Sequence, residues 1–70
     1  MTRLEAAAAA YRAAADRYDQ AAVAAITARS DGFTRAAHQA NARALDARHA
    51  LEHARDELVH AALAHDCEAA

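Results

Sequence analysis

Ser30-Asp31-Gly32-Phe33-Thr34 is the stretch that decides the fold, because it is the one point at which the helical character of the chain is interrupted. It holds the only glycine among 70 residues, and the sequence has no proline. Glycine readily takes the left-handed backbone conformation that ends a helix, while Asp31 or Thr34 can cap the helix that follows. The sequence therefore predicts a turn at 30–34.

On both sides of this turn the composition favours helix. Alanine supplies 26 of the 70 residues, and arginine, glutamate and leucine fill much of the rest. Near the start, Thr2-Arg3-Leu4-Glu5 has the form of a capping box, in which threonine accepts from the Glu5 amide and the Glu5 carboxylate reaches back. We therefore expect an all-α protein, a single domain over 1–70, folded as an antiparallel two-helix hairpin with helices over about 3–29 and 35–66.

A heptad pattern runs through both predicted helices and is typical of coiled coils. With Leu4 and Ala37 placed at position a, every d position is alanine, which lets two helices approach closely. The a positions are Leu4, Tyr11, Tyr18 and Ala25 in the first helix and Ala37, Ala44, Leu51 and Leu58 in the second; the d positions are Ala7, Ala14, Ala21, Ala28, Ala40, Ala47, Ala54 and Ala61.

The position of the turn also predicts which residues meet across the hairpin. A turn centred near 31–32 pairs residues whose numbers add to about 63. The second helix then outruns the first, so residues beyond about 62 project past the N-terminus. The expected neighbours are Leu4 with Val59, Tyr18 with Leu45, and Tyr11 with Leu51.

Five large apolar residues fall outside this seam, at positions b or f, and predict a second apolar surface. A 70-residue chain builds only a marginal core, and its lone cysteine, Cys67, cannot form an internal disulfide. We therefore expect a homo-oligomer, in the simplest case a dimer of hairpins that forms a four-helix bundle, although another protein is an alternative partner. The predicted function is a non-enzymatic, self-associating interaction or assembly module. Its predicted interface residues are Val23, Ile26, Leu45, Val59 and Leu63.

Histidine spacing supports a second hypothesis. His49, His53, Asp56 and His60 follow one another at intervals of 4, 3 and 4, so they line one helical face opposite the alanine seam. Two histidines one turn apart can chelate Zn²⁺, Ni²⁺ or Cu²⁺, with ligands from a second chain completing the shell. Glu57-Leu58-Val59-His60 also has the Glu-x-x-His form found in di-iron bundles. The alternative function is thus a divalent-metal-binding helical bundle, and the simplest interpretation of the stripe is solvated surface.

Charge and hydropathy argue against other classes of function. The net charge is −2, with eight arginines and no lysine, unlike the basic footprint of a nucleic-acid-binding protein. No window approaches the roughly 18 apolar residues of a membrane span. No nucleophile and base are paired, so no catalytic residue is predicted, and a single cysteine fits a reducing, cytoplasmic location.

Overall fold

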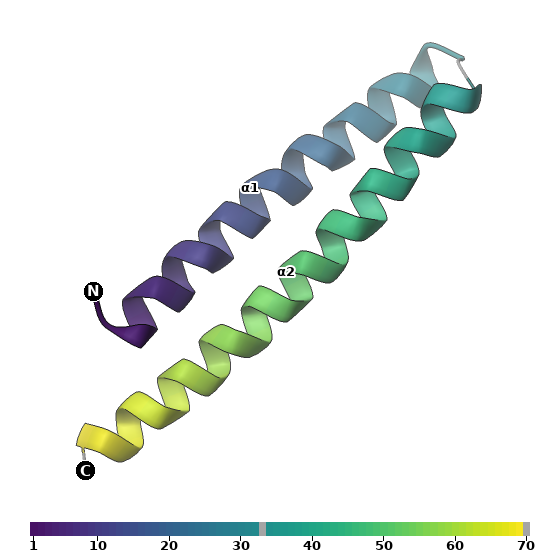
Figure 1. Ribbon diagram of the computed structural model, residues 1–70. Helices are drawn as coiled ribbons and strands as arrows, with labels where there is room; N and C mark the ends of the chain where they lie inside the picture. The colour runs from purple at the N-terminus through teal and green to yellow at the C-terminus, as the bar shows by residue number, and fades with distance from the viewer. Residues whose placement is uncertain (33, 70) are drawn as a thin grey trace.

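The chain folds into two long helices. A computed structural model describes residues 1–32 and 34–69, with side chains described as far as residue 67. Helix α1 (Arg3–Ser30) and helix α2 (Thr34–Ala69) run antiparallel and side by side (Figure 1). The described residues contain no strand, so the prediction of an all-helical chain with two helices is confirmed. The predicted boundaries were slightly short, because α1 continues to Ser30, and α2 starts at Thr34 and continues to Ala69.

Hydrogen bonds at the end of α1 explain where the helix stops. The amide of Asp31 donates to the carbonyl of Thr27 at 3.1 Å, and the amide of Gly32 donates to the carbonyl of Arg29 at 3.2 Å. Gly32 has φ +76°, the left-handed conformation that favours glycine at this position. Asp31 therefore caps the end of α1, and Thr34 is the first residue inside α2. Phe33, which completes the predicted turn, lies outside the described residues.

The start of α1 carries the predicted threonine cap, with a different second bond. Thr2 Oγ1 accepts from the Glu5 amide at 3.1 Å, which satisfies one of the free donors of the first turn. The Thr2 hydroxyl also donates to Glu5 Oε1 at 3.2 Å. The carboxylate thus reaches back to the threonine side chain, where a standard capping box would use the threonine amide.

The interior of the hairpin is a seam of alanines. Every residue assigned to position a or d is buried or half-buried, which confirms the heptad pattern. The buried apolar residues retain only 2% to 8% of their exposure, and no large side chain among the described residues is fully buried. Each alanine contributes about one methyl group of burial, roughly 0.8 kcal/mol. The buried residues are Ala14, Ala25, Ala40, Ala54 and Ala61.

Three hollows show which segments of the two helices lie side by side. Leu4 and Ala61 line one hollow at the open end of the hairpin, and Ala28 and Ala37 line another near the turn. Tyr11 and Leu51, which the sequence predicts to be neighbours, both line the hollow between these two.

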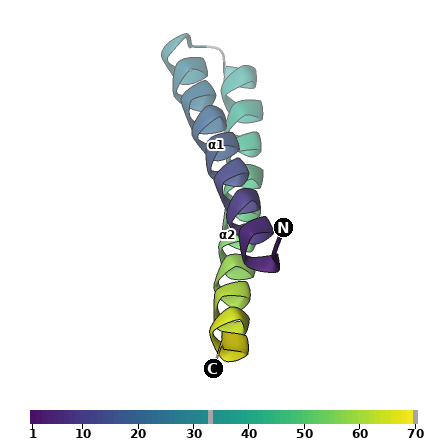
Figure 2. The same ribbon diagram turned by 90° about the vertical axis from the view of Figure 1, so that its left-hand side faces the viewer.

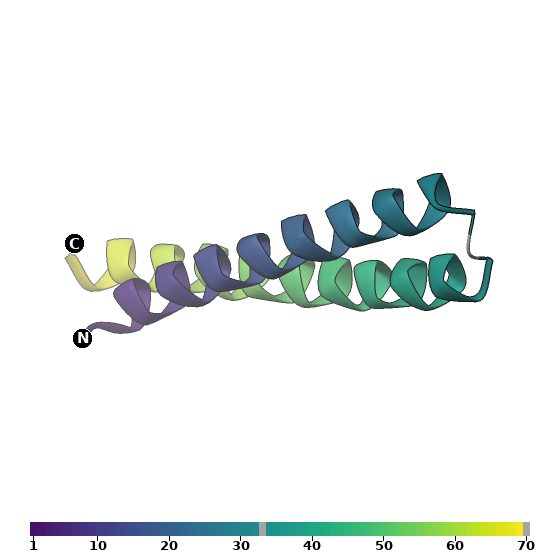
Figure 3. The same ribbon diagram turned by 90° about the horizontal axis from the view of Figure 1, so that it is seen from above.

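The hairpin is long and thin. Its extents are 56 × 15 × 13 Å and its radius of gyration is 16.0 Å, against about 11 Å for a compact 70-residue domain. The helices cross at a shallow angle, and α2 runs past the start of α1 (Figures 2 and 3). The accessible surface is 5233 Å², whereas a compact protein of 7.4 kDa would expose about 4,200 Å². About 1,000 Å² more surface than usual therefore faces solvent.

Candidate functional site

The five large side chains predicted to form an interface are all exposed in the hairpin. Each keeps between 50% and 62% of its surface accessible to solvent. Isolated exposed apolar residues are common on proteins, but several on one face form a patch that needs explaining. Together they are called here the second apolar surface: Val23, Ile26, Leu45, Val59 and Leu63.

The heptad positions of these residues indicate how they lie around the hairpin. On a helix, position b lies next to position e, and position f lies beyond b, almost opposite the seam. Because the helices of a hairpin run in opposite directions, their e flanks face the same way. The b residues Ile26, Leu45 and Val59 therefore lie toward one face of the hairpin, while the f residues Val23 and Leu63 lie at the outer edges of α1 and α2. The half-buried e alanines Ala8, Ala15 and Ala22 border the face of the b residues along α1.

The second apolar surface consists of two clusters at opposite ends. Val23 and Ile26 lie in the half of α1 nearer the turn, and Leu45 lies in the half of α2 nearer the turn; these three form the turn-end cluster. Val59 and Leu63 form the open-end cluster; they flank Ala61 in α2, which lines a hollow with Leu4. Met1 is 93% exposed, so it adds apolar area to that end.

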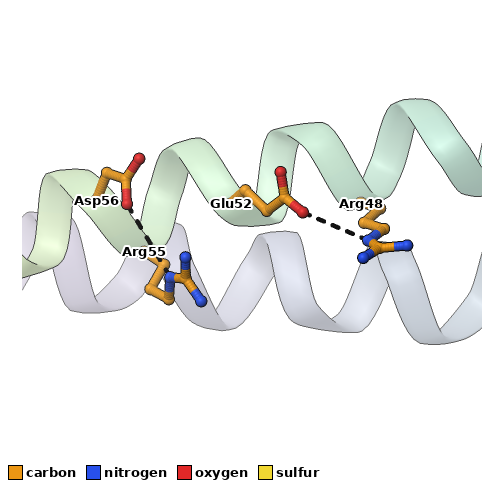
Figure 4. Close-up of polar contacts among 4 residues, drawn as sticks. All are labelled: Arg48, Glu52, Arg55 and Asp56. Carbon is orange, nitrogen blue, oxygen red and sulfur yellow. Dashed lines mark ion pairs between the residues drawn. The ribbon is translucent and has the colours of Figure 1, made fainter.

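A charged belt separates the two clusters. In α2, Arg48 Nε lies 3.3 Å from Glu52 Oε1, and Arg55 Nε lies 4.0 Å from Asp56 Oδ1 (Figure 4). All four side chains are at least half exposed, so each pair contributes less than about 1 kcal/mol. The belt borders a hollow of about 360 Å³ lined by Tyr11, Tyr18, Arg48, Leu51, Glu52 and Arg55.

The four residues of the predicted metal stripe are exposed on the outer side of α2, as expected from their spacing. Within the described residues, no group of three or more histidine, cysteine, aspartate or glutamate side chains is gathered closely enough to hold a metal ion. Asp56 already faces Arg55. A complete metal shell on His49, His53, Asp56 and His60 would therefore need ligands from a second chain.

A further hollow near the turn was not anticipated from the sequence. It has a volume of about 280 Å³, and polar side chains of Arg29, His38 and Asn41 border its alanine floor. These three residues occupy e and b positions, so this hollow opens on the side of the second apolar surface. The heptad pattern could have placed them on this flank, but the depth of the hollow depends on how the helices separate at the turn.

Two further observations bear on the class of protein. No helix in the part of the chain that the structure describes has the length and apolar character needed to cross a membrane. Comparisons with known protein families, with curated proteins and with solved structures find no match for this chain.

Proposed function

We propose that this chain is a non-enzymatic interaction module that associates with a second copy of itself through the second apolar surface, forming a four-helix bundle. The observation that carries the proposal is an inversion of the usual distribution of side chains. The buried residues of the hairpin are alanines, while large aliphatic residues outside the seam are exposed. A second hairpin that covers these residues would supply the large-residue core that the single hairpin lacks.

The exposed area supports the size of such an interface. The hairpin exposes about 1,000 Å² more than a compact chain of its mass, and a standard interface buries about 800 Å² on each partner. Burying a valine, leucine or isoleucine completely contributes about 1.5 to 3 kcal/mol. The residues of the second apolar surface are already partly covered, so each contributes about half of this on association.

The mass in solution tests this proposal directly. We expect light scattering at micromolar concentration to give twice the chain mass of 7.4 kDa. Leu45→Gln with Val59→Gln should shift the mass toward that of one chain, because the glutamines remove apolar area and keep helix propensity. The matched control, Ala13→Gln with Ala50→Gln, changes exposed residues on the other side of the hairpin and should leave the mass unchanged. A wild-type chain of single mass would overturn the proposal.

The histidine stripe is the basis of the rival function. His49 and His53 are both exposed and one helical turn apart, which is the spacing of a two-histidine chelate. A metal-linked assembly would lose mass on addition of a chelator and regain it with Zn²⁺. Self-association through aliphatic residues predicts the same mass with and without chelator.

A further inference from the structure

We propose that the hollow in the middle of the hairpin binds a small organic monoanion, one that joins a carboxylate to a compact apolar ring. This site is independent of the proposed self-association, because all of its residues belong to one chain. It is formed by two tyrosines of α1 and by two arginines, a leucine and a glutamate of α2: Tyr11, Tyr18, Arg48, Leu51, Glu52 and Arg55.

The spacing of large and small residues in the seam explains why this hollow exists. Tyr11 and Tyr18 are half-buried at successive a positions, two helical turns or about 10.5 Å apart. The seam residue between them is Ala14, which is buried and provides only a methyl group. No large seam residue of α1 therefore fills the space between the two rings. Its volume of about 360 Å³ lies within the usual range of small-molecule sites, roughly 300 to 1,000 Å³.

Two guanidinium groups supply positive charge to the hollow. Arg48 and Arg55 are also seven residues apart, and both side chains extend from α2 toward α1 (Figure 4). Their ion pairs are loose, since Arg48 Nε lies 3.3 Å from Glu52 and Arg55 Nε lies 4.0 Å from Asp56. Within the described residues, neither guanidinium group donates a hydrogen bond to another residue. Their N–H donors are therefore available to a carboxylate, which arginine binds through two parallel hydrogen bonds.

The residues that line the hollow favour a monoanion with an apolar body. Two arginines and one glutamate leave an excess of one positive charge, which a single carboxylate balances. Asp56 does not line the hollow, and its side chain is 65% exposed, so water screens its charge. The tyrosine rings and Leu51 provide apolar contact for the body of the ligand. A polyanion would place additional negative charge beside Glu52, and a cation would face both guanidinium groups.

Tyrosine fluorescence measures binding at this hollow, because the chain has no tryptophan and its two tyrosines both line the site. The test ligand is cyclohexanecarboxylate, which does not absorb where tyrosine is excited, and its neutral match is cyclohexanecarboxamide. We expect a saturable change in emission with a dissociation constant of about 1 mM, since few atoms make contact. The amide should bind at least about fivefold more weakly, because it lacks the charge that pairs with arginine.

Two double variants with the same change in net charge test the arginines. Arg48→Gln with Arg55→Gln removes both guanidinium groups from the hollow and should weaken binding of the carboxylate at least about fivefold. Arg35→Gln with Arg43→Gln is the matched control, since both positions are exposed and neither lines the hollow. At about 0.15 M salt, distant charges are screened, so the control should keep the wild-type affinity.

Each outcome has a separate meaning. Saturation that requires both the carboxylate and the two arginines of the hollow supports the site. Equal binding of the acid and the amide, or equal binding by the two double variants, would overturn it. The titration is repeated in the Leu45→Gln, Val59→Gln variant, in which self-association is weakened. Saturation in that variant supports the site whatever the mass of the wild-type chain, and a lack of saturation in both chains overturns the site without affecting the proposed self-association.

Discussion

The alanine seam and the second apolar surface are both apolar, but they differ in the size of their residues and in their exposure. The buried seam residues are alanines, whereas the second apolar surface carries valine, isoleucine and leucine that remain at least half exposed. Small residues allow two helices to approach closely, but they remove little apolar area from water. Close packing inside the hairpin is therefore achieved largely with small residues, which leaves the five large side chains of the second apolar surface available to a partner.

The largest expected effect comes from placing charges in the seam. Leu51→Asp with Leu58→Asp should abolish the hairpin, because each lost leucine contact costs at least about 2 kcal/mol and a half-buried carboxylate adds to that cost. The measurement is helical circular dichroism during urea titration.

The same leucine-to-aspartate change on the second apolar surface is the matched control. Leu45→Asp with Leu63→Asp should reduce the solution mass while retaining more helix than the seam variant at equal concentration. Equal loss of helix in both variants would mean that the two apolar regions do not differ in role.

A larger side chain in the seam tests close packing. Ala54→Leu should destabilise the chain by about 1 to 3 kcal/mol, because the added atoms push the two helices apart. The control is Ala50→Leu, four residues earlier at an exposed position, which should stay within about 0.5 kcal/mol of wild type. Thermal unfolding of both variants provides the comparison, and an unchanged midpoint for Ala54→Leu would contradict a tightly packed seam.

Gly32→Ala should change the stability of the hairpin only through the backbone conformation of the turn. A Cβ atom at this position meets no atom within 4 Å, so any loss of stability comes from holding alanine at φ +76°. That conformation costs about 1 to 2 kcal/mol for a residue with a side chain. We expect the midpoint of thermal unfolding of Gly32→Ala to be several degrees lower than that of the wild type. Asp31→Ala is the control, because this neighbouring residue has an ordinary φ of −79° and its substitution adds no such backbone cost.

The smallest effect is expected on the histidine stripe. The double variant His49→Ala, His53→Ala should keep its free energy of unfolding within about 0.5 kcal/mol of the wild-type value, since both side chains are exposed. Its mass in solution should be unchanged. Calorimetry with Zn²⁺, Ni²⁺ and Cu²⁺ checks the rival function. If the wild-type chain binds one of these metals at submillimolar concentration and the double variant does not, then His49 and His53 are metal ligands.

Much of the candidate site followed from periodicity. Placing Leu4 and Ala37 at position a was enough to predict that Val23, Ile26 and Leu45 would lie outside the seam, and the structure shows them exposed. Periodicity could not predict the hollow bordered by Arg29, His38 and Asn41, because that hollow depends on the separation of the helices near Gly32.

Local helix propensity and a repeat of seven are enough to predict the two helices, the turn at the single glycine of the sequence and the heptad position of each residue. Which residues share a hollow across the seam, as Leu4 does with Ala61, follows from the tertiary structure alone, because these contacts depend on how the side chains of both helices fit together.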